Sequence, residues 1–230
     1  MASCVSFSEL NNLGVARMKA GSFGEAFDYF LRATTLLHSH IEGTSFQTKD
    51  ANRVFEALSI TMVPVYKQFV AWPTEHTLTV LGSAVKIIGI DEEAVIFDHA
   101  EQSKTAAILL YNMGLCCHLK GLRTGRSASL DKAYRLYTGA LHTLENTFEL
   151  KISSDEVSCL IVALSNNCGH IKELLFDIEQ AKHFFSVLKT TLDTTSMSAT
   201  RKFCEVDYGS LCLSIVLQSQ FLPFAFAPAA

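Results

Sequence analysis

One predicted helix carries three consecutive residues of the types that bind metal ions, Cys116, Cys117 and His118. Successive side chains on a helix diverge by about 100°, so these three cannot converge on one ion. The chain has no Cys-x-x-Cys and no His-Glu-x-x-His spacing, and we expect His38 and His40, near a helix end, to be solvated. The sequence therefore predicts no metal site and no bound cofactor.

Signatures of catalysis and of phosphate binding are also weak. A Cys–His pair meets only in space, so the sequence leaves such a pair open, but there is no Gly-x-Ser-x-Gly motif. The stretch GLRTGR at 121–126 lacks the Lys-Ser/Thr of a phosphate-binding loop. We interpret 121–126 as a flexible basic loop, with an anion site or a phosphorylation site as the alternative.

The composition is that of a chain with a large core. Of the 230 residues, 49% are hydrophobic and 18% are charged, which argues against intrinsic disorder. The formal net charge is −4 and no long run of one sign occurs, so the basic footprint of a nucleic-acid-binding protein is missing. We predict a single domain, 1–230, that does not bind nucleic acid.

The N-terminus and the cysteines favour a reducing compartment. MASCVSFSEL has neither the positive n-region nor the apolar h-region of a secretory signal. The seven cysteines are odd in number and sit mostly in apolar helical patterns, which is typical of buried free thiols. We therefore predict an intracellular, cytoplasmic protein, with the nucleus as an open alternative.

The C-terminal stretch 208–230 carries no charged residue. It is about long enough to span a bilayer. Polar residues interrupt it, Pro223 among them, and no basic flank follows it. We interpret it as a buried terminal helix and tail, with a membrane anchor as the alternative.

The chain repeats one internal pattern three times. Each unit has an Asn two residues before a Gly, then an Ala twelve residues after that Gly, lengthened to nineteen in the second unit, then an aromatic residue four positions later. The small residues would let two antiparallel helices approach closely, and we expect the aromatic ring to fill the gap to the next unit. The positions are Gly14, Ala26 and Phe30; Gly114, Ala133 and Tyr137; and Gly169, Ala181 and Phe185.

This pattern resembles the tetratricopeptide repeat, most closely in NLGVARMKAGSFGEAFDYFLRA at 12–33. The third unit departs from the family at Phe176, where the family has Gly, and at Leu188, where it has Ala. The resemblance implies a mostly α fold: a short α-α superhelix of about three helical hairpins with a C-terminal capping helix. A partly β, hairpin-like insertion would follow the first hairpin.

The expected elements can be placed along the chain. Capping signals at Ser22 with Glu25, at Ser153 with Glu156 and at Asp177 with Gln180 mark helix starts. In the insertion we expect a β-hairpin between 78–88 and 92–97, while 53–69 could be a strand pair or a helix broken before Pro64. The repeat units are 5–39 (helices 5–20 and 23–39), 101–146 (helices 101–120 and 130–146) and 154–192 (helices 154–175 and 178–192); the insertion is 41–100, and the capping helix (199–219) and tail are 199–230.

In the tetratricopeptide register, one face of each first helix lines a concave groove. Family members that grip acidic C-terminal tails use Lys and Arg there, whereas this chain has Ile108, Ala163 and Asn167, which argues against that ligand. The asparagines would suit the main chain of an extended peptide, although for any single Asn a bond to a neighbouring helix is the more common role. The groove candidates are Asn12, Val15, Lys19, Tyr111, Asn112, Leu115, Asn167 and His170.

The sequence thus predicts a non-catalytic scaffold that binds an unknown protein or peptide. The function rests partly on analogy with the fold. Two alternatives stay open: an enzyme with a site in 41–100, and a tail-anchored membrane adaptor.

Overall fold

A computed structural model describes residues 5–44, 59–65, 82–88, 99–148, 154–195 and 211. Within these residues the chain is mostly helical, with one small antiparallel hairpin, as predicted; a superhelical repeat arrangement stays a prediction. The helices are α1 (Phe7–Lys19), α2 (Phe23–Thr44), α3 (His99–Thr124), α4 (Ser127–Phe148), α5 (Asp155–Leu174) and α6 (Ile178–Thr194), and the strands are β1 (Ser59–Pro64) and β2 (Ser83–Ile88).

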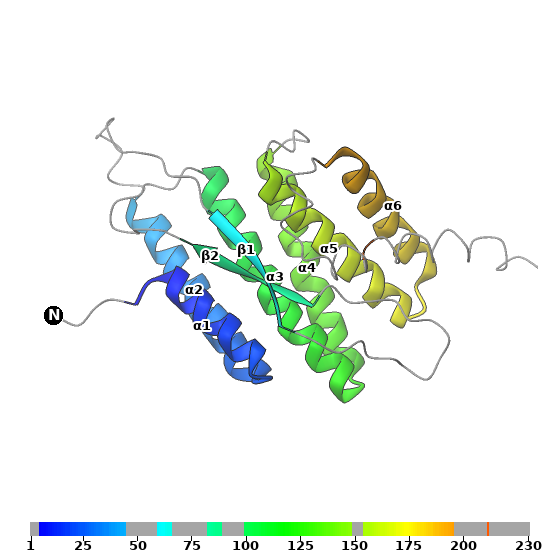
Figure 1. Ribbon diagram of the computed structural model, residues 1–230, viewed down its shortest axis with the longest axis horizontal. Helices are drawn as coiled ribbons and strands as arrows, with labels where there is room; N and C mark the ends of the chain where they lie inside the picture. Colours follow the sequence, from blue (N-terminus) through cyan, green and yellow to red (C-terminus); the bar gives the residue numbers. More distant parts are fainter. Residues whose placement is uncertain are drawn as a thin grey trace, which may run out of the picture.

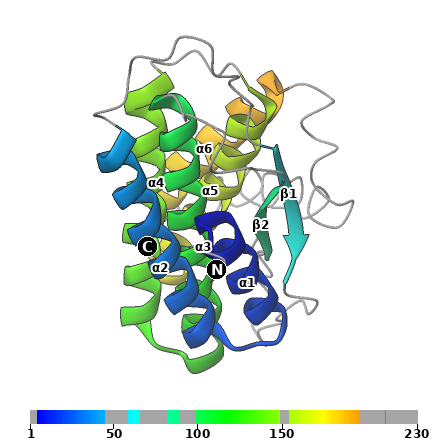
Figure 2. The same cartoon turned by 90° about the vertical axis from the view of Figure 1, so that its left-hand side faces the viewer.

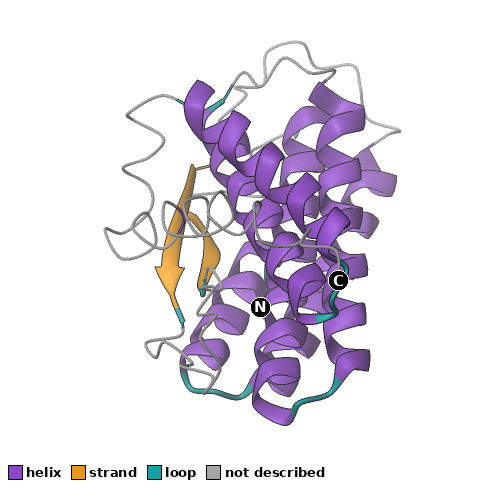
Figure 3. Cartoon of the chain, turned by 90° about the vertical axis from the view of Figure 1, so that its right-hand side faces the viewer, coloured by secondary structure: helices purple, strands orange, loops and turns teal. Residues whose placement is uncertain are grey.

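The helices form three neighbouring pairs, α1–α2, α3–α4 and α5–α6, arranged in a row (Figure 1). Short turns join the two helices of each pair, and α2 packs on α3 as α4 packs on α5. In Figures 2 and 3 the hairpin lies along one side of this helical layer, and β2 contacts α1 and α3. The first two pairs therefore provide the surface that carries the hairpin.

A glycine on the first helix of each pair allows the close approach of the second helix. A Cβ atom built on Gly14 would lie 2.5 Å from the ring of Phe30, and one built on Gly114 would lie 2.6 Å from the ring of Tyr137. Gly169 meets Phe185 in the same way. The three glycines are buried and the predicted close approach of the two helices is confirmed, but each aromatic ring rests on the glycine of its own pair, because the missing Cβ atom leaves space for the ring there.

The hairpin pairs segments that the sequence analysis did not pair. β2 lies within the expected strand region 78–88, but its partner is β1, with Met62 opposite Val85 and Ile60 opposite Ile87. The ambiguous 53–69 segment is therefore extended where it is described, and β1 ends at Pro64, as expected for a residue without an N–H. The expected partner 92–97 lies outside the described residues.

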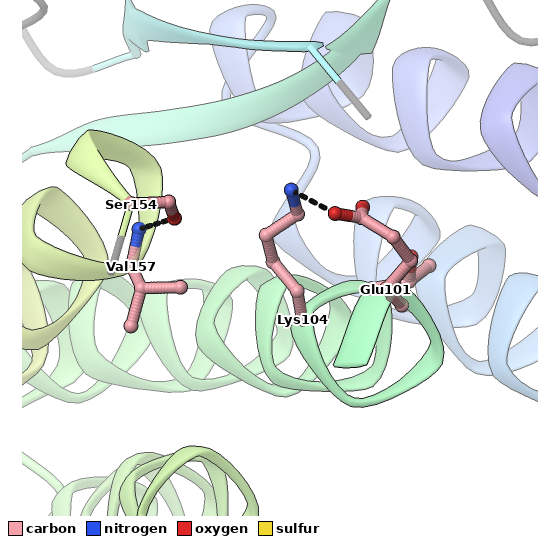
Figure 4. Close-up of polar contacts among 5 residues, drawn as sticks. Glu101, Lys104, Ser154 and Val157 are labelled. Carbon is pink, nitrogen blue, oxygen red and sulfur yellow. Dashed lines mark hydrogen bonds and ion pairs between the residues drawn. The ribbon is translucent and has the colours of Figure 1, made fainter. Parts of the chain in front are cut away.

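Helix starts are fixed by side-chain caps. At α1, Ser6 and Glu9 form a capping box that the sequence analysis missed. At α5 the cap is Ser154, whose Oγ accepts from the Val157 N–H at 3.3 Å (Figure 4), rather than the expected Ser153. At α6 the expected cap is confirmed, because Asp177 accepts from the Gln180 N–H.

The C-terminal predictions fall almost entirely outside the described residues. Of the expected capping helix 199–219 and the tail, the structure describes Leu211 alone, which is helical and buried. Among the described helices, none combines the length and the apolar character needed to cross a bilayer. The four described cysteines are free and buried, which agrees with the thiol interpretation.

Candidate peptide-binding site

The polar residues of α1 and α3 converge on the main chain of β2. Two residues come from each helix, and all four were either groove candidates or direct neighbours of one. We call this set, together with the strand it holds, the strand site: Asn11, Asn12, Tyr111 and Asn112.

Asn112 on α3 holds both main-chain polar groups of one strand residue. Its Oδ1 accepts from the Val85 N–H at 2.9 Å, and its Nδ2 donates to the Val85 carbonyl at 2.8 Å. The same amide also donates to the Oδ1 atom of Asn11 at 2.8 Å, and Asn11 donates to the Val85 carbonyl at 3.0 Å. Asn11, Asn112 and Val85 are all fully buried, so these bonds form away from water.

Asn12 on α1 repeats this arrangement two residues further along β2. Its Oδ1 accepts from the Ile87 N–H at 3.1 Å, and its Nδ2 donates to the Ile87 carbonyl at 2.8 Å. At the other end of the strand, the Tyr111 hydroxyl donates to the Ser83 carbonyl at 2.8 Å. The contacts therefore fall on alternate residues, Ser83, Val85 and Ile87.

This alternation identifies which edge of the strand is recognised. In an antiparallel pair, the N–H and C=O groups of a residue point to the same edge, and the edge alternates along the strand. Because Val85 and Ile87 point to the helices, the intervening Ala84 and Lys86 point to β1. The side chains of α1 and α3 thus occupy the position that a third strand would take.

The chemistry of the strand site is recognition of the main chain. A side-chain amide offers one acceptor and two donors, which matches the paired N–H and C=O of an extended residue. The four side chains of the site are uncharged, and each of their bonds to β2 goes to a main-chain group that every non-proline residue has. The adjoining side chains set the remaining requirement, because Ala84, Val85 and Ile87 are buried whereas Lys86 is exposed.

A second buried polar group lies between α3, α4 and α5. The His118 Nε2 and His170 Nδ1 atoms are 3.1 Å apart, and the Tyr137 hydroxyl is 3.4 Å from His118 Nδ1. Asn167 donates to the Tyr137 hydroxyl at 3.3 Å, and Asn166 donates to Asn167 at 3.2 Å. We call these five residues the histidine cluster.

The histidine cluster is electrically neutral at pH 7. Burial lowers the pKa of His118, with the neighbouring His170 as a second cause, and burial lowers the pKa of His170 to about 4. Burial likewise raises the pKa of Tyr137 well above its ordinary value. One set of tautomers satisfies the chain of bonds: Tyr137 donates to His118, which donates to His170.

The remaining groove candidates have other surroundings. Val15 and Leu115 are buried in the core, and Lys19 is exposed near the end of α1. Near the start of α3, the buried Lys104 forms an ion pair of 2.8 Å with Glu101 (Figure 4). The structure thus brings Asn12, Tyr111 and Asn112 onto one strand, and it places Asn167 and His170 in the histidine cluster. Sequence reasoning missed Asn11, whose only signal was its position next to Asn12.

Ionisable side chains are few in the two described strands of the insertion. No group of three or more His, Cys, Asp or Glu side chains that could hold a metal ion is found among them. In the described segments 59–65 and 82–88 of the insertion, Lys86 is the one ionisable side chain, and Glu42 and His99 lie in its described ends.

Comparisons with known proteins add no relative. The chain matches no protein-family model, and no curated protein and no solved structure is significantly similar to it.

Proposed function

We propose that this protein is a non-catalytic binding module, a short tetratricopeptide-like array that recognises the main chain of an extended protein segment. One observation carries the proposal: two helices hold alternate residues of an extended strand through side-chain amides and a tyrosine hydroxyl. The three glycine–aromatic helix pairs support the repeat architecture.

In this proposal β2 is the resident occupant, and a partner segment takes its place. A tethered strand competes at a high effective concentration, on the order of millimolar for a short flexible connection. The apparent affinity for an external segment is therefore reduced by the fraction of molecules in which the site is open. A partner binds tightly only when something weakens the docking of β2.

The partner chemistry follows from the strand that is bound. The segment needs free N–H groups at alternate positions and small or β-branched apolar side chains where Ala84, Val85 and Ile87 lie. It needs no particular charge, because the contacting side chains are neutral. Binding is expected to depend weakly on salt.

The test is replacement of β2 by a peptide. A fluorescent peptide with the sequence of residues 82–88, GSAVKII, is titrated into the full chain and into the Val85→Pro variant. Proline lacks the N–H that donates to the Asn112 Oδ1 atom, so β2 of the variant binds the strand site more weakly. We expect at least tenfold tighter peptide binding by the variant than by the unmodified chain.

Two controls make the result specific. The same peptide N-methylated at its valine lacks the N–H group and should not bind. Adding Asn112→Ala to Val85→Pro should abolish binding of the unmethylated peptide. If the variant keeps its helical circular dichroism and still binds neither peptide, the strand site is purely structural and the proposal is wrong.

A further inference from the structure

Two tyrosine rings join the strand site to the histidine cluster. The hydroxyl of Tyr111 donates to the Ser83 carbonyl of β2, and the centroid of the Tyr111 ring lies 5.8 Å from that of the Tyr137 ring. The Tyr137 hydroxyl in turn is 3.4 Å from the His118 Nδ1 atom. These four residues are fully buried, so an unbroken buried path runs from β2 to the histidines.

The histidine pair has no ring nitrogen free to take up a proton. In the tautomers that satisfy the cluster, His118 Nδ1 accepts from Tyr137, His170 Nδ1 accepts from His118 Nε2, and His170 Nε2 carries a hydrogen. A further proton therefore has to displace one of the two bonds. The contact from Tyr137 to His118 is 3.4 Å long, against 3.1 Å between the two histidines, and is the weaker bond of the two.

Displacement of that bond turns the Tyr137 hydroxyl and reaches Tyr111. A protonated His118 donates from Nδ1 to the Tyr137 oxygen, which also accepts from Asn167. The hydroxyl hydrogen of Tyr137 then has to point away from His118. Because the Tyr137 ring is packed closely against Gly114 and lies beside Tyr111, adjustment of the ring disturbs the side chain that holds this end of β2.

Among the described residues, no carboxylate acts on the histidine pair. The pKa of His118 is lowered by burial and then by His170, and the pKa of His170 is lowered by burial. The thiols that approach Tyr137, Cys117 on α3 and Cys168 on α5, are neutral because burial raises their pKa. The other ionisable groups on these elements and on α6 are Lys120; Asp131, Lys132 and Tyr134; Lys172, paired with Asp177, and Glu173, whose pKa burial raises to about 7; and the exposed or half-exposed Glu179, Lys182, His183, Lys189 and Asp193. With no negative partner, the pair can hold a proton only once water reaches it.

We propose that proton uptake by the histidine pair is coupled to release of β2, so that acid opens the strand site to a partner segment. The inference rests on the proposed function, since it concerns how the same site is opened. Release of β2 lets water reach the histidines, whose ordinary pKa is about 6.5, whereas the closed cluster holds the pKa of His170 at about 4. The open state therefore binds more protons, and each histidine exposed in this way favours it about tenfold more at pH 5.5 than at pH 7.5.

The test is binding of the GSAVKII peptide, capped at both ends, to the full chain at pH 7.5 and at pH 5.5. The capped peptide has no group that titrates in this range, so a change in affinity reports on the protein. Fluorescence anisotropy should show about tenfold tighter binding at pH 5.5. The peptide N-methylated at its valine should bind at neither pH, and circular dichroism should show the same helical content at both.

Three variants test the path between the two regions. His118→Gln keeps an acceptor for Tyr137 and a donor for His170 but does not titrate, so it should lose most of the acid increase. In Tyr111→Phe, β2 and the peptide both lose the same bond to the hydroxyl, so the affinity at pH 7.5 should stay unchanged while the acid increase disappears. His183→Gln is the matched control, because His183 is exposed on α6 and its substitution should leave the acid increase intact.

Several results would overturn the coupling. These are equal affinity of the unmodified chain at the two pH values, an acid increase that persists in His118→Gln or in Tyr111→Phe, and loss of helical content at pH 5.5, which would mean that acid unfolds the chain. The Val85→Pro variant separates this inference from the proposed function. If that variant binds the peptide tightly while the unmodified chain shows no acid increase, the coupling is wrong and the strand site is still a binding site. If no chain binds the peptide at either pH, both are wrong.

Discussion

The strand site and the histidine cluster both contain an asparagine at the same position before a glycine, but these asparagines bond different partners. Asn12, Asn112 and Asn167 each lie two residues before the glycine of a first helix. The first two bond the main chain of β2, whereas Asn167 bonds the Tyr137 hydroxyl. The helices that carry Asn12 and Asn112, α1 and α3, contact β2, whereas Asn167 on α5 bonds another side chain.

This difference shows that the position of the asparagine does not determine its role. A side-chain amide is satisfied equally by an extended main chain and by another polar side chain. What differs energetically is the partner left behind when the asparagine is removed. The buried main-chain N–H of Val85 has no other partner to turn to, whereas the Tyr137 hydroxyl keeps its bond to His118 when Asn167 is removed.

The sharpest test of the comparison is alanine substitution at the two kinds of asparagine. Asn112→Ala leaves the N–H of the buried Val85 unsatisfied and removes the amide's bonds to Val85 and Asn11, so we expect a loss of about 3 kcal/mol of unfolding free energy. Asn167→Ala removes two longer bonds to neutral side chains, one donated to Tyr137 and one accepted from Asn166, and should cost about 1 kcal/mol. Urea unfolding measures both, and equal losses would contradict the distinction.

Glycine-to-alanine substitutions compare the aromatic rings that lie against Gly114 and Gly14. The Tyr137 ring beside Gly114 is tethered through its hydroxyl to the histidine cluster, whereas the Phe30 ring beside Gly14 has no polar atom. We expect Gly114→Ala to cost about 2 kcal/mol and Gly14→Ala about 1 kcal/mol, because the free ring shifts more easily. Chemical denaturation gives both values. Adding Tyr137→Phe should reduce the penalty at Gly114, and no reduction would show that tethering is irrelevant.

Of the two regions, only the histidine cluster should make the protein less stable in acid. The folded-state pKa values of His118 and His170 lie below the ordinary value, so the unfolded chain binds more protons once the pH falls below about 6.5. Their contribution to stability is complete at neutral pH and is lost as the pH falls. We expect a loss of about 1 kcal/mol per histidine between pH 7.5 and 5.5, measured by urea melts.

Glu173 opposes this acid effect and gives a control. Burial raises the pKa of Glu173 to about 7, so the folded chain binds more protons there than the unfolded chain, and this contribution fades as the pH rises through 7. Glu173→Gln should therefore steepen the loss at acid pH. His170→Leu should flatten it, while Asn112→Ala should leave its slope unchanged. A slope insensitive to His170 would refute the assignment.

The smallest expected effect concerns the turns that connect the helices of each pair. Phe176→Gly should raise the unfolding free energy by about 0.5–1 kcal/mol, because glycine relieves the positive φ at the expense of greater freedom in the unfolded chain. Gly21→Ala should lower it by a similar amount. Thermal melts measure the stability of both variants. If both substitutions change it in the same direction, this explanation of the turns is wrong.

The helical part of the fold was predictable because it is written in local patterns. Small residues and aromatics at fixed spacing predicted the six described helices to within five residues at each end, and the predicted close approach is present where Phe30 lies against Gly14. The pairing of β2 with β1 was not predictable from local patterns, because the two strands are separated in the sequence. Pro64 also left the segment around β1 open to interpretation as a helix broken before the proline. Likewise Asn12 and Asn112 could be named as candidates, but nothing local indicates which segment they hold.

The strand site also sets an order of events during synthesis. It joins Asn11 to Asn112 across 101 residues and Asn12 to Ile87 across 75, whereas each helix pair closes locally. At a translation rate of about 5–20 residues per second, the 80 residues from Thr44 to Thr124 take roughly 4–16 s to make. During that interval α1 and α2 are already synthesised, and Asn11 and Asn12 cannot complete their bonds to β2 and α3 until those elements have been made. The nascent N-terminal pair therefore depends on segments that are made later, first β2 and then α3, for the partners of its polar side chains.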